Sequence, residues 1–198
     1  MNAVRKIRIK TTLKYTWPFY LVLTVLVILL MNFIFSVTHK TPAYKTLTIF
    51  VSGEVTDSKK LKNDLLEKYQ EKDLKSVSTI SEDPGSPYYY SKLSVTGYNS
   101  ADILIIPESI LTKLTISAFG LKITPELKSD YFTGLTFFSQ EDSEYGIKLA
   151  KEKVKDYMLF PSEDCYMVIN AKSENIGSYS LNETKRDNAL TLAKDWGM

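Results

Sequence analysis

One uncharged, apolar run near the N-terminus constrains this chain more than any other feature. It extends from Trp17 to Val37, and no Asp, Glu, Lys or Arg occurs between Tyr15 and His39. About 20 apolar residues in a helix cross a hydrocarbon core about 30 Å thick. In lipid a single segment can satisfy its backbone hydrogen bonds only as a helix. The run therefore predicts a transmembrane helix over residues 15–39.

The charges on either side of this run predict its orientation. The basic residues before it are Arg5, Lys6, Arg8, Lys10 and Lys14, with no acidic residue among them. The first acidic residue of the chain is Glu54. Because basic flanks are retained on the cytoplasmic side, we expect residues 1–14 to form a cytoplasmic basic tail. The long C-terminal part is then extracellular, outside the cell membrane.

A cleaved signal peptide is the alternative to a permanent anchor. The apolar region of a signal peptide is about 7–15 residues long and ends in a small-residue cleavage site. Here the run is longer, and the sequence FSVTHK at its end is a poor cleavage site. No cysteine stands there to carry a lipid. We therefore expect an uncleaved, single-pass signal-anchor, followed by a short stalk over residues 40–44.

The remaining chain, residues 45–198, is long enough for one domain with its own core and too short for two. After Lys40 the chain has 19 basic and 23 acidic residues, a net charge of −4, although the whole chain sums to +2. The mild basicity therefore belongs to the anchor region. Because the outer part lacks a basic footprint, we expect no nucleic-acid partner. The lack of a cysteine pair fits a bacterial cell surface.

Few residue types here can carry catalysis or bind a metal. The single histidine, His39, adjoins the membrane run, and the single cysteine, Cys165, lies in an apolar, strand-like segment. Zinc sites and Ser-His-Asp or Cys-His catalysis are thereby excluded, so we expect no metal, no cofactor and no enzyme. A carboxylate-based hydrolase is the one catalytic class left open. Its candidate acids are Glu141, Asp142, Glu163 and Asp164.

The first half of the outer part alternates between strand-like and helix-like patterns. The compact apolar run Leu47–Gly53 predicts a buried strand, and the leucines that follow Asp57 recur at helical spacing. Residues 75–80 predict a second strand, and Ile103–Ile106 a third, which stops at Pro107 before a helix through Leu114. Fully apolar strands that alternate with amphipathic helices predict a three-layer α/β domain with a mainly parallel sheet.

The second half is less regular. We expect strands near Glu144–Ala150, Tyr157–Phe160 and Cys165–Asn170, and a closing helix over Asn188–Trp196. The stretch between Gly120 and these strands predicts turns and short apolar pieces.

The order of these segments resembles the first lobe of the extracellular solute-binding proteins of ABC importers. The resemblance is carried by Ser52-Gly53 after the first strand, by Ala101–Pro107, and by the sequence from Phe160-Pro161 to Asn170. It implies the fold of one lobe of a periplasmic binding protein. Two departures are evident: a second lobe is absent, and an uncleaved helix replaces the lipid-bearing cysteine. A lone lobe cannot close a hinged cleft around a solute.

In open α/β sheets, ligands sit beyond the carboxyl ends of the strands. The residues expected on the rim of a ligand or partner site are Ser52, Gly53, Glu54, Pro107, Glu108 and Ser109, with Tyr88, Tyr89 and Tyr90 near them. The alternative is that the loop residues are ordinary connections and that the tyrosines pack against the core.

Two functions follow from these features, besides the hydrolase. In the first, the chain is a non-enzymatic, membrane-anchored binding or accessory domain, part of an ABC-type or other membrane complex. In that complex it recognises an integral membrane protein such as a transporter, or a small ligand. In the second, it is a purely structural single-pass subunit. Asn32, a polar residue within the span, would then contact a neighbouring helix.

Overall fold

The computed structural model describes residues 3–38, 41–180 and 186–197, in two compact units, Met1–Lys40 and Thr41–Met198. His39, at the end of the predicted anchor, and Lys40, at the start of the predicted stalk, lie outside the described residues. Residues 1 and 2 of the predicted basic tail also lie outside them.

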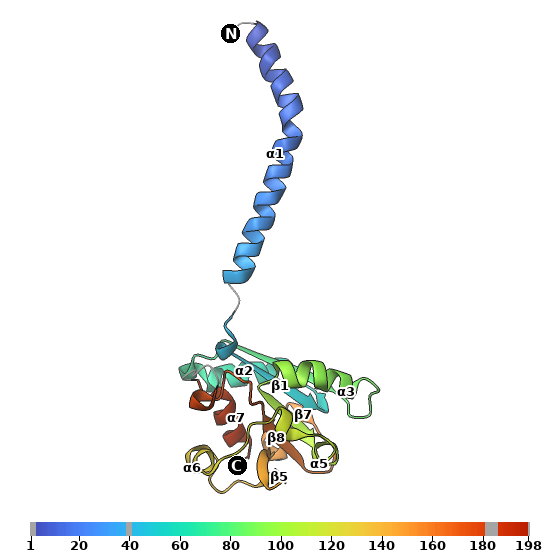
Figure 1. Ribbon diagram of the computed structural model, residues 1–198, viewed down its shortest axis with the longest axis vertical. Coiled ribbons are helices and arrows are strands. Elements are labelled where there is room, and N and C mark those ends of the chain that lie inside the picture. Colours follow the sequence, from blue (N-terminus) through green and yellow to red (C-terminus); the bar gives the residue numbers. More distant parts are fainter. Residues whose placement is uncertain (1–2, 39–40, 181–185, 198) are drawn as a thin grey trace. The chain divides into compact units, whose positions relative to one another are not determined.

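The first unit is a single helix, α1, which extends over Ala3–Thr38 (Figure 1). Its segment Tyr15–Ser36 is apolar and long enough to cross a membrane, and none of that segment is buried within the structure. The helix starts well before the apolar run, so the predicted basic tail continues the same helix from Ala3. By length and composition, the segment fits a membrane anchor or a signal sequence.

The second unit is an α/β domain built on a six-stranded sheet, with strand order β3-β1-β4-β8-β6-β5. Its strands are β1 (Thr46–Ser52), β3 (Ser76–Glu82), β4 (Ile103–Pro107), β5 (Phe137–Gln140), β6 (Ser143–Lys148) and β8 (Cys165–Ile169). A separate two-stranded ribbon pairs β2 (Glu54–Val55) with β7 (Met158–Leu159) in antiparallel fashion. The α/β class predicted from the sequence is confirmed.

The sheet is mostly parallel in strand direction, and its two halves differ. β1 pairs in parallel with both β3 and β4. On the other side of β4, the neighbours β8, β6 and β5 pair in antiparallel fashion, so that β6 again points the same way as β1. The strand β5 was not predicted. It forms a hairpin with β6 whose turn residues Glu141 and Asp142 both have positive φ, 50° and 57°.

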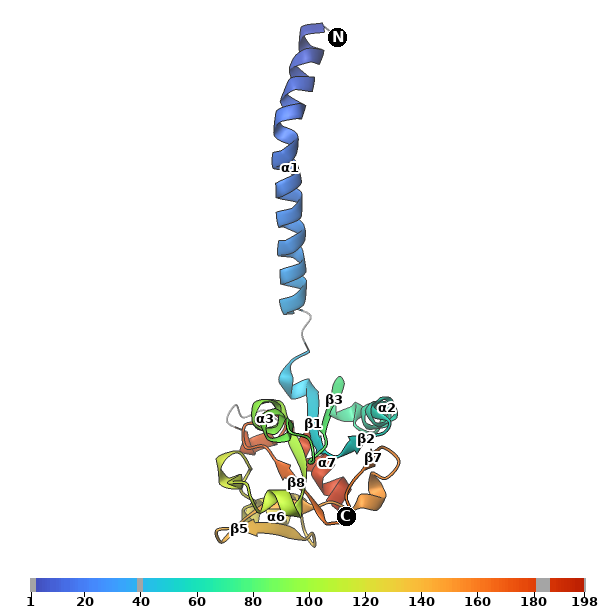
Figure 2. The same cartoon turned by 90° about the vertical axis from the view of Figure 1, so that its right-hand side faces the viewer.

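The helices cover both faces of this sheet. They are α2 (Ser58–Lys68), α3 (Tyr89–Lys92), α4 (Tyr98–Ser100), α5 (Glu108–Leu111), α6 (Pro125–Tyr131) and α7 (Asn188–Gly197). Single helical turns are η1 (Ala43–Lys45), η2 (Gln70–Lys72), η3 (Leu93–Gly97), η4 (Ile116–Ala118), η5 (Lys151–Lys153) and η6 (Gly177–Tyr179). Figure 2 shows α2 and α3 on opposite sides of β1. The helix predicted to follow Pro107 is shorter than expected, because α5 ends at Leu111 rather than Leu114.

Alternate residues of each central strand enter two different cores, as the pleat of a strand requires. In β1, Ile49 and Val51 pack in the core that contains residues of α2 and α7, whereas Phe50 packs in the core that contains Tyr89 and Leu93. This two-sided burial explains why Ile49–Val51, the centre of β1, is an unbroken apolar run. The result is the three-layer arrangement predicted for this domain.

Candidate functional site

A cleft of about 500 Å³ opens at the carboxyl ends of the parallel strands, and we call it the carboxyl-end cleft. Its walls come from the β1–β2 link, the segments after β3 and β4, and the loop that joins β7 to β8. The lining residues are Gly53, Glu54, Asp83, Pro84, Pro107, Ser109, Ile110, Leu159, Phe160, Pro161 and Glu163.

The connections of the sheet explain where this cleft lies. From β1 the chain passes through α2 to β3 on one side, and from β3 it returns to β4 on the other side of β1. The loops that leave β1 and β4 therefore diverge and leave a crevice between them. This is the place at which open α/β sheets characteristically bind ligands.

Gly53 allows the backbone after β1 to pack directly against the backbone of β7. A Cβ atom built at this position would lie 2.7 Å from the main-chain oxygen of Leu159. Only glycine lets two backbones approach to this distance without displacement. Close packing against Leu159 therefore explains the glycine at position 53, whether or not the cleft binds a ligand.

Glu163 joins the β7–β8 loop to the start of α5. The Ser109 N–H donates to Glu163 Oε2 at 2.9 Å, and the Ser109 hydroxyl donates to Glu163 Oε1 at 2.8 Å. The next residue, Asp164, pairs with Lys148 at 2.6 Å. These carboxylates hold one wall of the cleft in place, and Glu141 and Asp142 lie apart from them at the β5–β6 turn.

The structure brings some of the predicted rim residues together and separates others. Gly53, Glu54, Pro107 and Ser109 line the carboxyl-end cleft. Glu108 is exposed and does not line it. Ser52 is fully buried, and its hydroxyl lies 2.6 Å from the hydroxyl of Tyr89.

The three consecutive tyrosines do not form a unit. Tyr89 is fully buried, whereas Tyr88 is 73% exposed and Tyr90 is 52% exposed. None of the three lines the carboxyl-end cleft. Burial raises the pKa of Tyr89 to about 12, so its phenol keeps its proton and can donate to Ser52 at neutral pH.

Sequence reasoning missed the residues that reach the cleft from elsewhere in the chain: Asp83, Pro84, Ile110, Leu159, Phe160, Pro161 and Glu163. Pro84-Gly85 and Pro161 are residues typical of turns and loops. Nothing in the local pattern placed either loop beside the end of β1.

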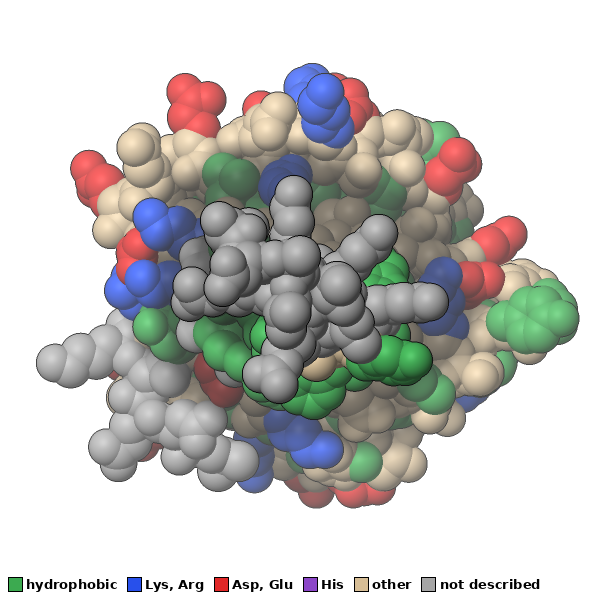
Figure 3. All heavy atoms as spheres, turned by 90° about the horizontal axis from the view of Figure 1, so that it is seen from above, with side chains coloured by type: hydrophobic (Ala, Val, Ile, Leu, Met, Phe, Trp, Pro, Cys, Tyr) green, Lys and Arg blue, Asp and Glu red, His purple; other side chains and the backbone are tan. Residues whose placement is uncertain are grey.

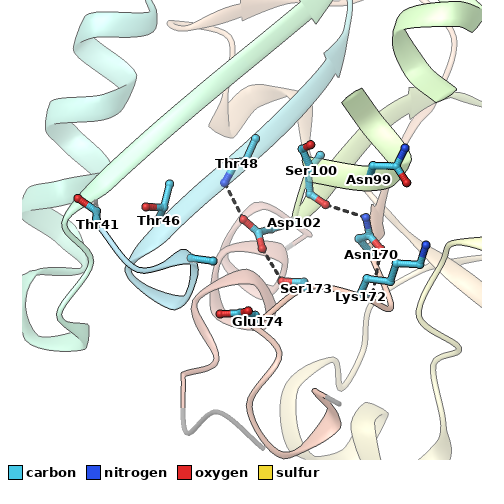
Figure 4. A pocket seen from close by; sticks show the side chains of 12 residues that line it. Thr41, Thr46, Thr48, Asn99, Ser100, Asp102, Asn170, Lys172, Ser173 and Glu174 are labelled. Carbon is cyan, nitrogen blue, oxygen red and sulfur yellow. Dashed lines mark hydrogen bonds between the residues drawn. The ribbon is translucent and has the colours of Figure 1, made fainter. Parts of the chain in front are cut away.

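A second cleft, of about 430 Å³, lies at the amino ends of β1 and β4, and we call it the amino-end cleft (Figure 4). At its centre the buried Asp102 carboxylate is surrounded by hydrogen-bond donors. Asp102 Oδ2 accepts from the Thr48 N–H at 2.7 Å, and Oδ1 accepts from the Ser173 hydroxyl at 2.5 Å. The side-chain amide of Asn175 also donates to Oδ1, at 3.1 Å.

This network fastens segments that are distant in the sequence. Asn175 donates onward to the carbonyl of Thr46 at 2.9 Å, and Asn188, at the start of α7, donates to Asn175 at 3.2 Å. Desolvation by burial raises the pKa of Asp102 above its usual range, although its hydrogen bonds act in the opposite direction. Because the carboxylate oxygens already have donors, the amino-end cleft is best described as a structural junction.

Asn32 is a polar residue within the apolar part of helix α1. Among the described residues, the structure gives the Asn32 carboxamide no hydrogen-bond partner, and the side chain is exposed. Thr24 differs, since its hydroxyl donates to the carbonyl of Tyr20 within the helix at 2.8 Å.

Charged side chains of both signs are interspersed over the face of the domain shown in Figure 3. Asp73 is one example of such pairing in the domain: its carboxylate lies 2.7 Å from the Lys45 ammonium and 2.8 Å from the Arg186 guanidinium. Lys45, with help from Lys75 and Arg186, holds the pKa of Asp73 below its usual range.

No protein-family model, curated protein or solved structure matches this chain. The resemblance to a lobe of solute-binding proteins therefore stays a prediction from the sequence pattern.

Proposed function

We propose that this protein is a non-enzymatic binding or accessory component of the cell membrane. Helix α1 is its uncleaved anchor, with the N-terminus in the cytoplasm and the α/β domain outside. The domain binds a small ligand or a membrane-protein partner, within an ABC-type or other membrane complex. The length and apolar character of Tyr15–Ser36 support the anchor, and the basic flank supports the orientation.

The observation that carries the binding role is the position of the carboxyl-end cleft at the switch point between β1 and β4. Its volume lies within the range of about 300–1,000 Å³ typical of ligand sites. It also lies at the end of the sheet opposite to Thr41 and Ala43, which line the amino-end cleft. The site is therefore remote from the residues at which the domain begins.

Photocrosslinking in intact cells tests this role. A benzophenone amino acid at Leu159, which is 56% exposed and lines the cleft, should form an adduct with the occupant. The same group at Val95, which is 64% exposed and does not line the cleft, is the matched control. Mass spectrometry should find a defined adduct at the first position and not at the second. Equal labelling at both positions, or none at either, contradicts a binding role for the cleft.

A second candidate, a purely structural single-pass subunit, is favoured by Asn32. A carboxamide in the hydrocarbon region gains from a hydrogen bond to another helix, because lipid supplies no partner. The helix would then hold the protein in a larger membrane assembly.

Replacing Asn32 with leucine separates a tether from a packing helix. If the helix packs against a partner through Asn32, the substitution should reduce co-purification of that partner in gentle detergent by about tenfold, which corresponds to about 1.4 kcal/mol. Thr24→Val is the control, since the Thr24 hydroxyl is already satisfied within the helix. Quantitative mass spectrometry of the purified complexes measures both. Unchanged co-purification of Asn32→Leu would leave the helix as a tether only.

A further inference from the structure

We infer that the carboxyl-end cleft selects small organic cations that carry an apolar group beside an ammonium or guanidinium. This inference rests on the proposed binding role of the cleft and names the class of ligand. It starts from the composition of the walls, which combine carboxylates with apolar surface.

The charge of the lining has one sign. Three carboxylates, those of Glu54, Asp83 and Glu163, line the cleft, and none of the described lining residues is Lys or Arg. Each comes from a different segment of the chain: Glu54 from β2, Asp83 from the loop after β3, and Glu163 from the loop between β7 and β8. A cation entering this space gains from all three charges, whereas an anion is repelled.

The carboxylates keep acceptor capacity for such a ligand. The structure gives Glu54 no ion-pair partner among the described residues, and Asp83 accepts a local N–H, that of Gly85 at 2.9 Å. Glu163 accepts twice from Ser109, which fixes its direction while other lone pairs remain. Lys151 donates to the carbonyls of Pro161 and Glu163, and its side chain does not line the cleft.

The rest of the lining is largely apolar. Pro84, Pro107, Ile110, Leu159, Phe160 and Pro161 form this surface. An aromatic ring such as that of Phe160 attracts cations through its π face in addition to burying apolar groups. The cleft is thus complementary to a ligand with a charged end and an apolar body, and not to a sugar or a phosphate.

A small molecule suits the cleft better than a protein surface does. The exposed large apolar side chains described in the domain are Tyr88, Tyr90, Val95 and Leu159, and only Leu159 of these lines the cleft. A stable protein interface buries about 800 Å² on each partner, with an apolar centre. Here the apolar surface lies inside the cleft and does not extend around it.

Three probes of nearly equal size test the inference on the full-length chain in detergent micelles. They are phenethylamine, 2-phenylethanol and phenylacetate, which are cationic, neutral and anionic at neutral pH. The methyl NMR signals of Ile110 and Leu159 report on the cleft itself. We expect phenethylamine to shift these signals saturably, with a Kd at least about fivefold lower than that of the alcohol, and phenylacetate to bind more weakly still.

Matched variants assign the effect to the cleft carboxylates. The pair Glu54→Gln and Asp83→Asn should raise the Kd of phenethylamine by about fivefold, and asparagine keeps an oxygen for the Gly85 N–H. The control pair Glu67→Gln and Glu71→Gln removes the same charge from exposed positions that do not line the cleft. It should leave the Kd unchanged within about twofold.

The outcomes separate the two proposals. If the alcohol or phenylacetate binds as well as the amine, or if the cleft variants have no effect, the cation selectivity is wrong while the cleft remains a binding site. A third outcome is that no probe shifts the NMR signals of Ile110 and Leu159, while the photocrosslinked adduct at Leu159 is a protein. The occupant is then a protein: the inference of a small cation is wrong, and the binding role of the cleft stands. If neither probe binding nor an adduct is found, both proposals fall.

Discussion

Replacing Asp102 with alanine should lower the free energy of unfolding of the α/β domain by about 3–5 kcal/mol. The substitution leaves three donors without their acceptor: the Thr48 N–H, the Ser173 hydroxyl and the Asn175 amide. These groups are buried or partly buried, so the loss exceeds that of an exposed hydrogen bond. Urea unfolding of the full chain in detergent, followed by the fluorescence of Trp196 in a Trp17→Phe background, measures the change.

Two further variants make this result specific. Glu71→Ala removes a carboxylate from an exposed position and should change the free energy of unfolding by less than about 0.5 kcal/mol. Asp102→Asn keeps the shape and one acceptor oxygen, so its loss should be smaller than that of alanine. If Asp102→Ala destabilised the domain no more than Glu71→Ala does, the network would not be a structural junction.

Asp102 also has a defined effect on the pH dependence of stability. Burial raises the pKa of this carboxyl in the folded state, so the folded state binds its proton more tightly than the unfolded state does. The stability contributed by protonated Asp102 is full below the unfolded pKa of about 3.9 and is lost as the pH rises through the folded pKa. The difference in unfolding free energy between the wild type and Asp102→Asn should therefore shrink with rising pH across that window.

The helices and strands that could be predicted are those whose own residues form a clear apolar or amphipathic pattern. The uncharged run after Tyr15 predicts the long apolar helix, because a run of this length matches the number of helical residues needed to cross a hydrocarbon core. The strands β1 and β4 were recognisable because both of their faces are buried, so that each contains an unbroken apolar run, Ile49–Val51 and Ile103–Ile106. Asp57 is the N-cap of α2, and its carboxylate accepts from the Lys60 N–H at 2.8 Å, a role that the residue type favours.

In the antiparallel half of the sheet, β6 and β8 were predicted and β5 was not. β5 contains Phe137 and Phe138 followed by polar residues, and its side chains are at most partly buried. Its apolar signal is correspondingly short. In the separate ribbon, β7 lies within the strand predicted at Tyr157–Phe160, whereas β2 was not predicted. β2 pairs with β7 because distant segments meet, with Glu54 opposite Leu159. No local periodicity can reveal a pairing of this kind.

The same distinction applies to the carboxyl-end cleft. Gly53 and Pro107 were predictable members because they end parallel strands, and such ends meet at one edge of a sheet. Glu163 was not, since its position depends on hydrogen bonds to Ser109, 54 residues earlier. Asp102 escaped notice for the same reason, because its partners in the chain are 54 to 73 residues away. Polar side chains that act over long sequence distances leave no local signal.

Substitution of the three consecutive tyrosines should affect stability unequally, because Tyr89 lies in the core whereas Tyr88 and Tyr90 lie on the surface. Tyr89→Ala removes a fully buried ring that packs against Phe50 and should lower the free energy of unfolding by about 3–5 kcal/mol. Tyr89→Phe keeps the ring and removes only the hydroxyl 2.6 Å from that of Ser52, so it should lose about 1 kcal/mol. The Trp196 fluorescence assay described above measures both.

Tyr88→Ala is the matched control, because Tyr88 is 73% exposed and directly precedes the buried ring. It should change the free energy of unfolding by less than about 0.5 kcal/mol. It should also leave phenethylamine binding unchanged, since Tyr88 does not line the carboxyl-end cleft. Equal destabilisation by Tyr88→Ala and Tyr89→Ala would contradict this expected difference. Weaker phenethylamine binding in Tyr88→Ala, at unchanged stability, would instead show that Tyr88 contributes to the rim of the binding site, as the sequence predicts.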